Sequence, residues 1–497
     1  MVRIFCWLIV TLTIFAKGHA QVDSTSEQRD FERYAKEEEK AFHAYVKMEE
    51  ENFKNYNDSI NREFGKYLAE TWKEFNLEWQ EPLIKYPVPL TVYNPDVPRP
   101  KPARLPVKKE VELPKRLLPR VEPDISLPLK LPVNVSTNQL EKSFYGVTIT
   151  FNKPTFSMPR LTGTTEREVS AFWMALAKLP YEDWAGRIIQ WKSGLKLNDW
   201  GLYLLIKEAF TAYAPDGTEN EEVIFTVFTL NQLGYRAKIG RVKQKLVPFI
   251  AFGCHVSNTS IFSHEKIIYS AVNTKHTNLS SVQICRVNYP GATKLLDMSV
   301  DFSPMLTSEV VTKAVKDTRR SYELRFNKNL VDWYATYPLV NFAIYAKAAL
   351  DEDFLQSVTQ QIKPVLNGLS QEQAINELLH FVQFAFTYAK DRAQFGYEKW
   401  NFAEETIASS YSDCEDRAIL FTQLVRTLLD MPIVLIYYPN RHLATAVKFD
   451  DPQIEGDYII TVDGQKYLLC DPTYETAVAG MCMPQLRDVP IEVIKLK

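Results

Sequence analysis

The sequence predicts a protein of the α+β class, in which two globular regions follow a long helix and a proline-rich segment. In each globular region, segments with apolar residues at helical spacing precede short segments typical of strands. At 497 residues the chain is too long for one hydrophobic core, so two or three domains are expected. A net charge of −3 and the lack of a basic patch interleaved with aromatic residues argue against a nucleic-acid partner.

Residues 1–20 have the pattern of a secretory signal peptide. Arg3 precedes an apolar run over residues 4–15, and Gly18 and Ala20 supply the small residues of a cleavage site. We therefore expect an exported protein, either periplasmic or secreted. No later stretch reaches about 18 consecutive apolar residues, so a transmembrane segment is not expected.

Five cysteines remain once Cys6 leaves with the signal peptide: Cys254, Cys285, Cys414, Cys470 and Cys482. An odd number in an oxidising compartment leaves at least one thiol free or bonded to another chain. The alternative is that all five are small, buried, hydrophobic side chains. The count does not choose between these readings, and the pairing among Cys254, Cys285, Cys470 and Cys482 stays open.

Residues 21–80 carry an aromatic repeat with a period of eleven residues. Phenylalanine recurs at Phe31, Phe42, Phe53, Phe64 and Phe75, and tyrosine follows three residues after each of the first four. Eleven residues make three helical turns, so the repeat predicts one aromatic stripe along a helix of about 75 Å. Such a stripe needs a partner helix, a second copy of itself or a sheet to pack on. We expect the partner to be a second copy of the helix or another exported protein. The alternative is a solvated, charged helix with no specific role.

Residues 81–140 form a proline-rich linker, with thirteen prolines between Pro82 and Pro132. Proline lacks a backbone N–H and blocks both helix and sheet ladders. The composition predicts an extended linker or strap along the surface of a domain.

Residues 141–310 are predicted to form the first globular domain, and residues 311–497 the second. The expected helices of the first domain are 171–179, 201–213 and 223–233. Its expected strands include 147–151, 237–242 and 246–252. The expected helices of the second domain are 346–355, 371–387 and 417–429. Its expected strands are 433–438, 444–449, 458–462 and 467–470.

Three residues of the second domain form a candidate thiol site. Cys414 begins a predicted helix, where unpaired N–H groups and the helix dipole are expected to lower the pKa of a thiol and to bind an oxyanion. His442 opens a strand, and Asp471 follows the end of another. A thiol nucleophile needs a base that takes its proton and a third group that orients this base.

The run Asp413-Cys414-Glu415-Asp416, followed by His442 and by Asp471-Pro472-Thr473-Tyr474, resembles the transglutaminase-like superfamily of the bacterial exported type. The resemblance covers about residues 370–480. It implies a papain-like fold in which Cys414 is the nucleophile, His442 is general base and acid, and Asp471 orients His442.

The resemblance also implies a side chain upstream of the cysteine that assists the oxyanion. Gln394, Tyr397 and Trp400 are the candidates, and their spacing does not choose among them. The flanking Asp413 and Asp416 are interpreted as helix caps.

The first globular domain is interpreted as a degenerate copy of the transglutaminase-like fold. Aligning Gly234 with Asp430 places Thr218 at the position of Cys414, so the first copy lacks the thiol. In the same alignment, the strand that contains Lys245 falls close to the position of His442, and the first copy has no acid to pair with it. The alternative is two unrelated α+β domains.

No metal or cofactor is expected from the sequence. His264 and His276 lack ligand-like neighbours, and Cys470 and Cys482 do not form a CxxC pair.

The functional prediction is an exported cysteine hydrolase that acts on amide bonds through a thioester intermediate. Its substrate would be a peptide or protein, including cell-wall peptide stems, and an amine acceptor would turn hydrolysis into cross-linking. The alternative is a catalytically silent, two-lobed binding or scaffold protein, whose long helix and proline-rich strap engage a partner.

Overall fold

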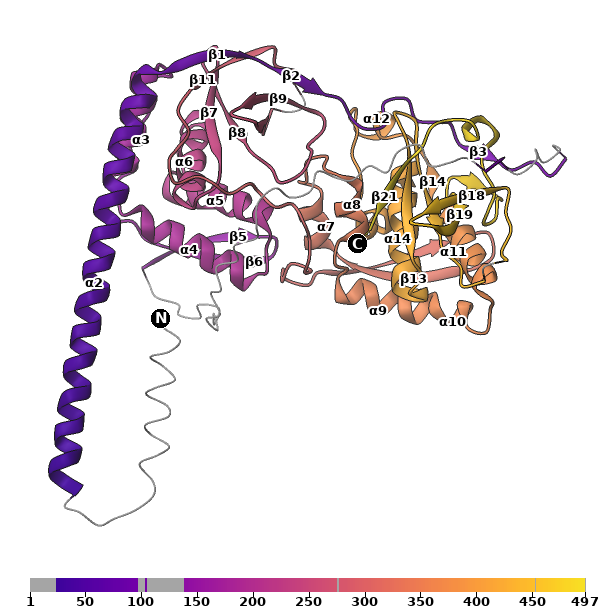
Figure 1. The fold of residues 1–497 in the computed structure, drawn as a ribbon, viewed down its shortest axis with the longest axis horizontal. Coiled ribbons are helices and arrows are strands. Elements are labelled where there is room, and N and C mark those ends of the chain that lie inside the picture. Colours follow the sequence, from indigo (N-terminus) through magenta and orange to yellow (C-terminus); the bar gives the residue numbers. More distant parts are fainter. Residues whose placement is uncertain (1–23, 97–102, 105–137, 275–276, 452, 497) are drawn as a thin grey trace. The chain divides into compact units, whose positions relative to one another are not determined.

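The computed structural model describes residues 24–96, 103–104, 138–274, 277–451 and 453–496. The chain divides into two compact units, Met1–Glu63 and Phe64–Lys497. The predicted α+β class is confirmed (Figure 1). The predicted signal peptide, most of the proline-rich segment and His276 lie outside the described residues.

Helix α2 (Ser24–Glu70) has 47 residues and is therefore about 70 Å long. Within the unit Met1–Glu63, the aromatic side chains Tyr34, Phe42, Tyr45 and Tyr56 are between 57% and 63% exposed. The side chains of Phe31 and Phe53 lie outside the described residues. The described aromatic side chains of this unit therefore face solvent in the single chain. Phe64, the next phenylalanine of the repeat, is instead buried, and its ring lies 5.0 Å from that of Trp173.

The prediction that this helix reaches residue 80 is wrong. After Glu70 the chain forms strands β1 (Trp72–Asn76) and β2 (Glu78–Gln80). Strand β1 pairs antiparallel with β11 (Ser281–Cys285), and the ring of Phe75 lies 5.0 Å from that of Phe262. The backbone groups of β1 pair with the edge of a sheet, and the Phe75 side chain packs into the core of that sheet. These tertiary contacts override the helical period of the sequence.

The first lobe (residues 138–309) combines a helical layer with an antiparallel sheet. Its helices are α3 (Glu166–Leu176), α4 (Tyr181–Gly194), α5 (Asp199–Tyr213) and α6 (Glu219–Gln232). A separate hairpin consists of β5 (Gln139–Phe144) and β6 (Val147–Asn152). The main sheet contains β7 (Ala237–Val242), β8 (Lys245–Ile250), β9 (Thr259–His264), β10 (Ile267–Ala271) and β11. Helix α4 was not predicted.

The second lobe (residues 310–496) begins with the hairpin β12 (Val310–Lys316) and β13 (Ser321–Asn327). Its longer helices are α9 (Glu352–Gln361), α11 (Gln371–Ala385) and α14 (Cys414–Leu424). Its shorter helices are α7 (Lys328–Tyr334), α8 (Phe342–Lys347), α10 (Lys363–Leu366), α12 (Asp391–Gln394) and α13 (Ala403–Ala408). Its main sheet contains β16 (Ile433–Tyr438), β17 (His442–Val447), β18 (Tyr458–Val462), β19 (Gln465–Cys470) and β21 (Glu492–Lys495).

The helix predicted for residues 346–355 is two helices, α8 and α9. The break follows from a capping signal, because the Asp351 side chain accepts a hydrogen bond from the backbone N–H of Asp353. An aspartate at an N-cap starts a new helix and satisfies one of its unpaired donors.

The two lobes have the same strand order in their main sheets. The first sheet runs β1-β11-β7-β8-β10-β9-β2, and the second runs β21-β16-β17-β19-β18-β4. The run β11-β7-β8-β10-β9 therefore matches β21-β16-β17-β19-β18, and all neighbours within both runs are antiparallel. In each lobe one helix, α6 or α14, directly precedes the first central strand.

The described part of the proline-rich segment runs along the second lobe. Residues 82–93, here called the strap, lead into β3 (Thr91–Val92), which pairs with β20 (Tyr474–Glu475). Further on, β4 (Ala103–Arg104) pairs with β18. Both pairings are parallel, so the segment adds short strands to the second lobe.

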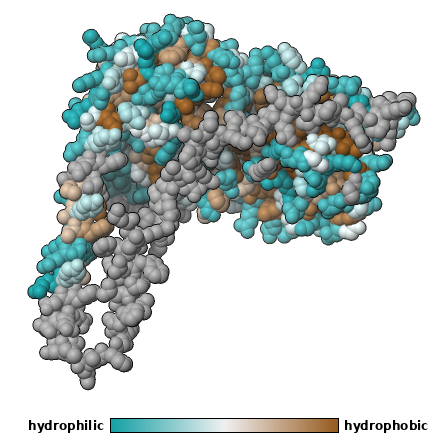
Figure 2. All heavy atoms as spheres, viewed as in Figure 1, coloured by the Kyte–Doolittle hydropathy of each residue, from teal (hydrophilic) through white to brown (hydrophobic). Residues whose placement is uncertain are grey.

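Hydrophilic residues predominate on the face drawn in Figure 2, with smaller hydrophobic areas between them. Within the part of the chain that the structure describes, none of the helices has the length and apolar character needed to span a membrane.

Candidate active site

Helix α14 places Cys414 at the centre of the second lobe. All eleven of its residues are buried, as expected for a helix that is packed on every side. Asp416 closes its first turn by accepting hydrogen bonds from the backbone N–H groups of Asn401 (2.8 Å) and Asp413 (3.5 Å). The predicted capping role therefore holds for Asp416.

Asp413 is the N-cap residue of α14 and forms a capping box with Asp416. Its Oδ1 is buried and has no hydrogen-bond partner among the described residues. Asp413 therefore does more than cap the helix, because its side chain also lies among other acidic side chains.

His442 and Asp471 form a buried pair. His442 is the first residue of β17 and Asp471 follows the last residue of β19, so antiparallel pairing of these strands brings the two side chains together. The distance from His442 Nε2 to Asp471 Oδ2 is 2.8 Å, and Asp471 Oδ1 accepts from the backbone N–H of Thr473 at 2.9 Å. When Nε2 carries the hydrogen, the lone pair lies on Nδ1, which has no partner among the described residues.

The Cys414 thiol contacts the strand that carries His442, but it is hydrogen-bonded to another acid. The backbone N–H of Leu443, the residue after His442, donates to Cys414. The thiol itself donates to Glu415 Oε2, with an Sγ–O distance of 2.9 Å. Cys414 and His442 are both 0% exposed.

The expectation of a lowered thiol pKa is wrong for this arrangement. Burial raises the pKa of Cys414 well above its usual value, and the negative charges of Glu415 and Asp413 raise it further. The hydrogen bond from Leu443 acts in the opposite direction. The helix N-terminus favours a thiolate, but two neighbouring carboxyl groups outweigh it.

The three oxyanion candidates differ in the state of their donors. Gln394 Nε2 donates to the carbonyl of Ala389 at 2.8 Å, and Tyr397 is partly exposed. Trp400 is buried, its ring centroid lies 4.1 Å from that of Phe342, and its Nε1 has no acceptor among the described residues. Trp400 is therefore the candidate with a free, buried N–H donor.

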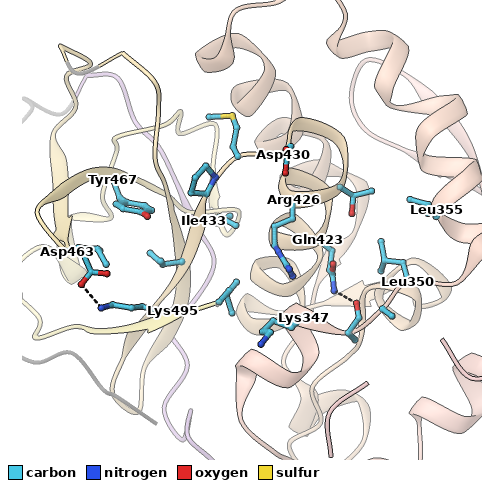
Figure 3. Close-up of a pocket in the computed structure, with 18 residues that line it drawn as sticks. Lys347, Leu350, Leu355, Gln423, Arg426, Asp430, Ile433, Asp463, Tyr467 and Lys495 are labelled. Atoms are coloured by element: carbon cyan, nitrogen blue, oxygen red, sulfur yellow. Dashed lines mark hydrogen bonds and ion pairs between the residues drawn. The ribbon is translucent and has the colours of Figure 1, made fainter. Parts of the chain in front are cut away.

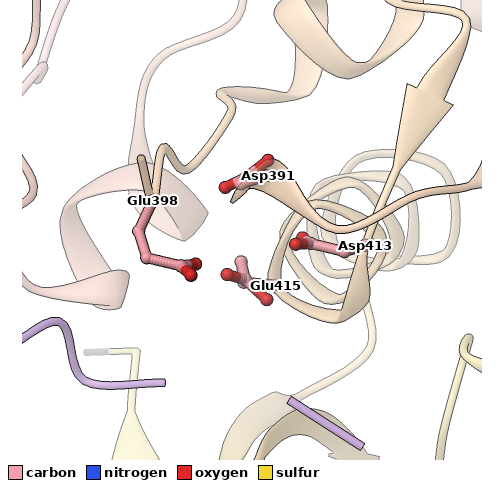
Figure 4. Close-up of side chains that lie close together, drawn as sticks. All are labelled: Asp391, Glu398, Asp413 and Glu415. Carbon is pink, nitrogen blue, oxygen red and sulfur yellow. The ribbon is translucent and has the colours of Figure 1, made fainter. Parts of the chain in front are cut away.

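Four buried acidic residues surround the start of α14: Asp391, Glu398, Asp413 and Glu415. One carboxylate oxygen from each lies within 4.8 Å of the others. Figure 4 shows the four carboxylates converging on one point. This cluster was not predicted from the sequence. The acids on both sides of Cys414 were the available signal, because helix capping does not require that many negative charges.

The strap connects the turn before His442 with the loop before Asp391. The backbone N–H groups of Tyr86 and Val88 donate to the carbonyls of Asn440 (2.9 Å) and Arg441 (3.0 Å). On its other side, the carbonyl of Val88 accepts from the hydroxyl of Tyr388 at 3.0 Å. Prolines fill the alternate positions 87 and 89, where no N–H is needed for this pairing.

Two pockets in the described part of the chain differ in their relation to this site. A pocket of about 330 Å³ lies beside the strap, and Glu398 lines it together with Lys85 and Arg392. A larger pocket of about 660 Å³ lies on another side of the lobe (Figure 3). Its Gln423 and Arg426 already donate to backbone carbonyls, so we assign the chemistry to the site at Cys414 and not to the larger pocket.

The first lobe carries other residues at the equivalent positions. Val242 pairs with Lys245 as Tyr438 pairs with His442, so Lys245 stands where the second lobe has its histidine. The pairing of β10 with β8, compared with that of β19 and β17, places Asn273 where the second lobe has Asp471.

The predicted match of Thr218 with Cys414 is wrong by one residue. Thr218 is the N-cap of α6, whereas Cys414 is the first residue after the N-cap of α14. Both helices lead into a left-handed residue, Gly234 and Asp430. The path through Val425–Leu429 is a π turn, which inserts one extra residue into a helix and accounts for the shift.

All five described cysteines are free thiols. Comparison of the chain with family models, curated proteins and solved structures finds no match.

Proposed function

We propose that the second lobe is an exported, transglutaminase-like cysteine hydrolase or acyl transferase that acts on amide bonds. The observation that carries this proposal is the buried His442–Asp471 pair, whose free Nδ1 belongs to the strand that also contacts the Cys414 thiol. A thiol, a base and an orienting carboxylate are the minimum set for acyl transfer through a thioester.

The reaction would proceed in two steps. Cys414 Sγ attacks the amide carbonyl carbon while its proton passes to His442 Nδ1, and that proton then goes to the departing amine. Water or a second amine next attacks the thioester, with His442 again taking and returning a proton. Asp471 holds the His442 ring and stabilises its charged form.

Trp400 would assist the negative carbonyl oxygen in both steps. Its indole N–H is buried and has no acceptor among the described residues, so a ligand oxygen would meet a donor that is already free. The first N–H groups of α14 would add to this stabilisation, because helix N-termini carry unpaired donors.

The proposed activity is tested by screening the mature protein against peptide amides and cell-wall peptide stems, with and without an amine acceptor. We expect Cys414→Ala and His442→Ala to abolish turnover while circular dichroism stays unchanged. Cys254→Ala is the matched control and should keep full activity. Full activity of the Cys414 variant on any substrate of the wild type would refute the assignment.

A second function is favoured by the state of the thiol. Cys414 is fully buried, donates a hydrogen bond to Glu415 and has a raised pKa. These properties are typical of a non-catalytic lobe that binds a partner. In that case the exposed aromatic side chains of α2 would mediate self-association or contact with another exported protein. Alkylation distinguishes the two functions, because an activated Cys414 reacts rapidly at neutral pH and an inert one does not.

A further inference from the structure

The acidic cluster beside Cys414 has more negative charge than its surroundings neutralise. Arg392 contacts Glu398 at 3.3 Å, but its side chain is 61% exposed. The ammonium of Lys399 is directed at Glu405, and the guanidinium of Arg417 donates to Ser412 and to a backbone carbonyl. Among the described residues, Glu398, at the rim of the cluster, is therefore the member that pairs with a cationic side chain.

Three carboxylate oxygens in the cluster are left without partners. Asp391 Oδ1, Asp413 Oδ1 and Glu415 Oε1 are buried and accept no hydrogen bond from any described residue. Their residues are at most 1% exposed, and Figure 4 shows the side chains directed at one another. A buried acceptor without a donor is strongly unfavourable, so these oxygens need either protons on the carboxyl groups or a cation between them.

We propose that Asp391, Glu398, Asp413 and Glu415 bind a calcium ion next to the nucleophile. The site offers only oxygen ligands, and four carboxylates supply up to eight of them, which is the range that calcium takes. One oxygen of each residue lies within 4.8 Å of the others, which is close enough for one ion with bonds of about 2.4 Å. Magnesium is a poorer fit, because it prefers water and one or two carboxylates.

The alternative to a cation is a cluster that holds its own protons. Burial and the charges of Asp413 and Asp416 raise the pKa of Asp391 to about 10, and Glu415 also has a raised pKa because of burial and neighbouring acids. Without a cation, protons would have to neutralise the cluster at neutral pH.

The test is calcium binding to the mature chain after removal of metals with EDTA, followed by calorimetry and by thermal unfolding. We expect a dissociation constant below about 1 mM, as for extracellular calcium sites. The double variant Asp391→Asn/Glu398→Gln should bind at least about tenfold more weakly, because affinity follows the number of ligand charges. Glu404→Gln removes a buried acid outside the cluster and should bind calcium like the wild type.

Several outcomes would overturn the proposal. They are a folded wild type that binds no calcium at several millimolar, a double variant with wild-type affinity, and tighter binding of magnesium than of calcium. Should the double variant fail to fold, Glu398→Gln alone serves, since Glu398 lies at the rim and the other three acids remain. The measurement uses no substrate, so its result is independent of the proposed amide chemistry.

Discussion

The two lobes share one strand order, but the pKa of the acid in the first turn of the central helix is shifted in opposite directions. In the first lobe, Glu221 accepts hydrogen bonds from the backbones of Thr218 (2.7 Å) and Leu161 (2.8 Å), and Arg160 lies beside it. These contacts outweigh burial and lower the pKa of Glu221. In the second lobe, the equivalent Asp416 is also hydrogen-bonded, but burial still raises its pKa to about 6.

The difference is consistent with the proposal that the second lobe carries the chemistry and the first lobe does not. The first lobe pairs its central acid and places Lys245 and Asn273 where the second lobe has His442 and Asp471. The second lobe leaves carboxylates unpaired around a thiol. Perturbed titratable groups concentrated in one place are typical of functional sites.

The largest expected effect comes from changing the equivalent residues Asp471 and Asn273. Asp471→Asn should lower acyl transfer by about 10³–10⁴-fold, because His442 loses the carboxylate that fixes its hydrogen on Nε2. Asn273→Asp, the matched change in the first lobe, should leave the rate unchanged. Rate measurements on both variants test this, and equal losses in the two would break the distinction between the lobes.

The next effect is on the pH dependence of stability. Burial raises the pKa of Glu404 from 4.5 to about 7, so the folded state keeps a proton that the unfolded state has lost. Unfolding then releases a proton between these pH values, and stability decreases as pH rises through this window, by on the order of 3 kcal/mol.

Glu404→Gln should flatten that decrease in urea unfolding at pH 4.5 and pH 7.5. Glu221→Gln in the first lobe should act in the opposite direction, because the lowered pKa of Glu221 adds stability as pH rises. A wild-type pH profile that Glu404→Gln leaves unchanged would rule out this role for Glu404.

Removing the hydrogen bonds of the strap should have an effect of intermediate size, an increase in the rate of Cys414 alkylation in the second lobe. Tyr86→Pro/Val88→Pro keeps an extended chain but removes both N–H donors to Asn440 and Arg441. Losing two hydrogen bonds of about 1 kcal/mol each should raise alkylation of Cys414 by roughly 30-fold. Pro87→Ala/Pro89→Ala keeps the donors and should change little, and equal rates in the two double variants would show that the strap does not control access.

The smallest expected effect is a difference in stability between variants of the two N-cap residues, Thr218 of α6 and Asp413 of α14. Thr218→Ala should destabilise the protein by about 1 kcal/mol, because Thr218 caps α6 with a hydrogen bond to Glu221 N at 3.2 Å. Asp413→Asn in the presence of EDTA should instead stabilise, because burial and neighbouring acids disfavour the charged form of Asp413 and asparagine remains a good N-cap. A loss of stability in the Asp413 variant under EDTA would contradict this expectation.

Local patterns predicted much of the fold. The strands at 237–242, 433–438 and 458–462 have the predicted bounds, because buried strands bounded by turn residues are distinctive. The end of α2 could not be predicted, since Phe75 continues the helical period while its backbone pairs with a distant strand. The break between α8 and α9 near Asp351 was not predicted, although its capping signal was present in the sequence.

The candidate site was predictable only in part, for a related reason. Cys414, His442 and Asp471 lie at the ends of elements, where spacing in the sequence carries information. Asp391 begins the four-residue helix α12 and Glu398 lies in the loop after it, so both join the site only through folding and no periodicity marks them. The π turn in the second lobe shifted the register between the lobes by one residue, which a gapless alignment does not detect.

The central claim is that His442 activates Cys414, and the rate of Cys414 alkylation tests it most directly. The measurement is iodoacetamide labelling of the folded chain at neutral pH, followed residue by residue by mass spectrometry, in the wild type and in His442→Ala. We predict that Cys414 is labelled in the wild type and at least about tenfold more slowly in the variant, with labelling of Cys254 the same in both. Equal labelling of Cys414 in the two proteins, or a Cys414 that stays unlabelled in the wild type, would contradict the account.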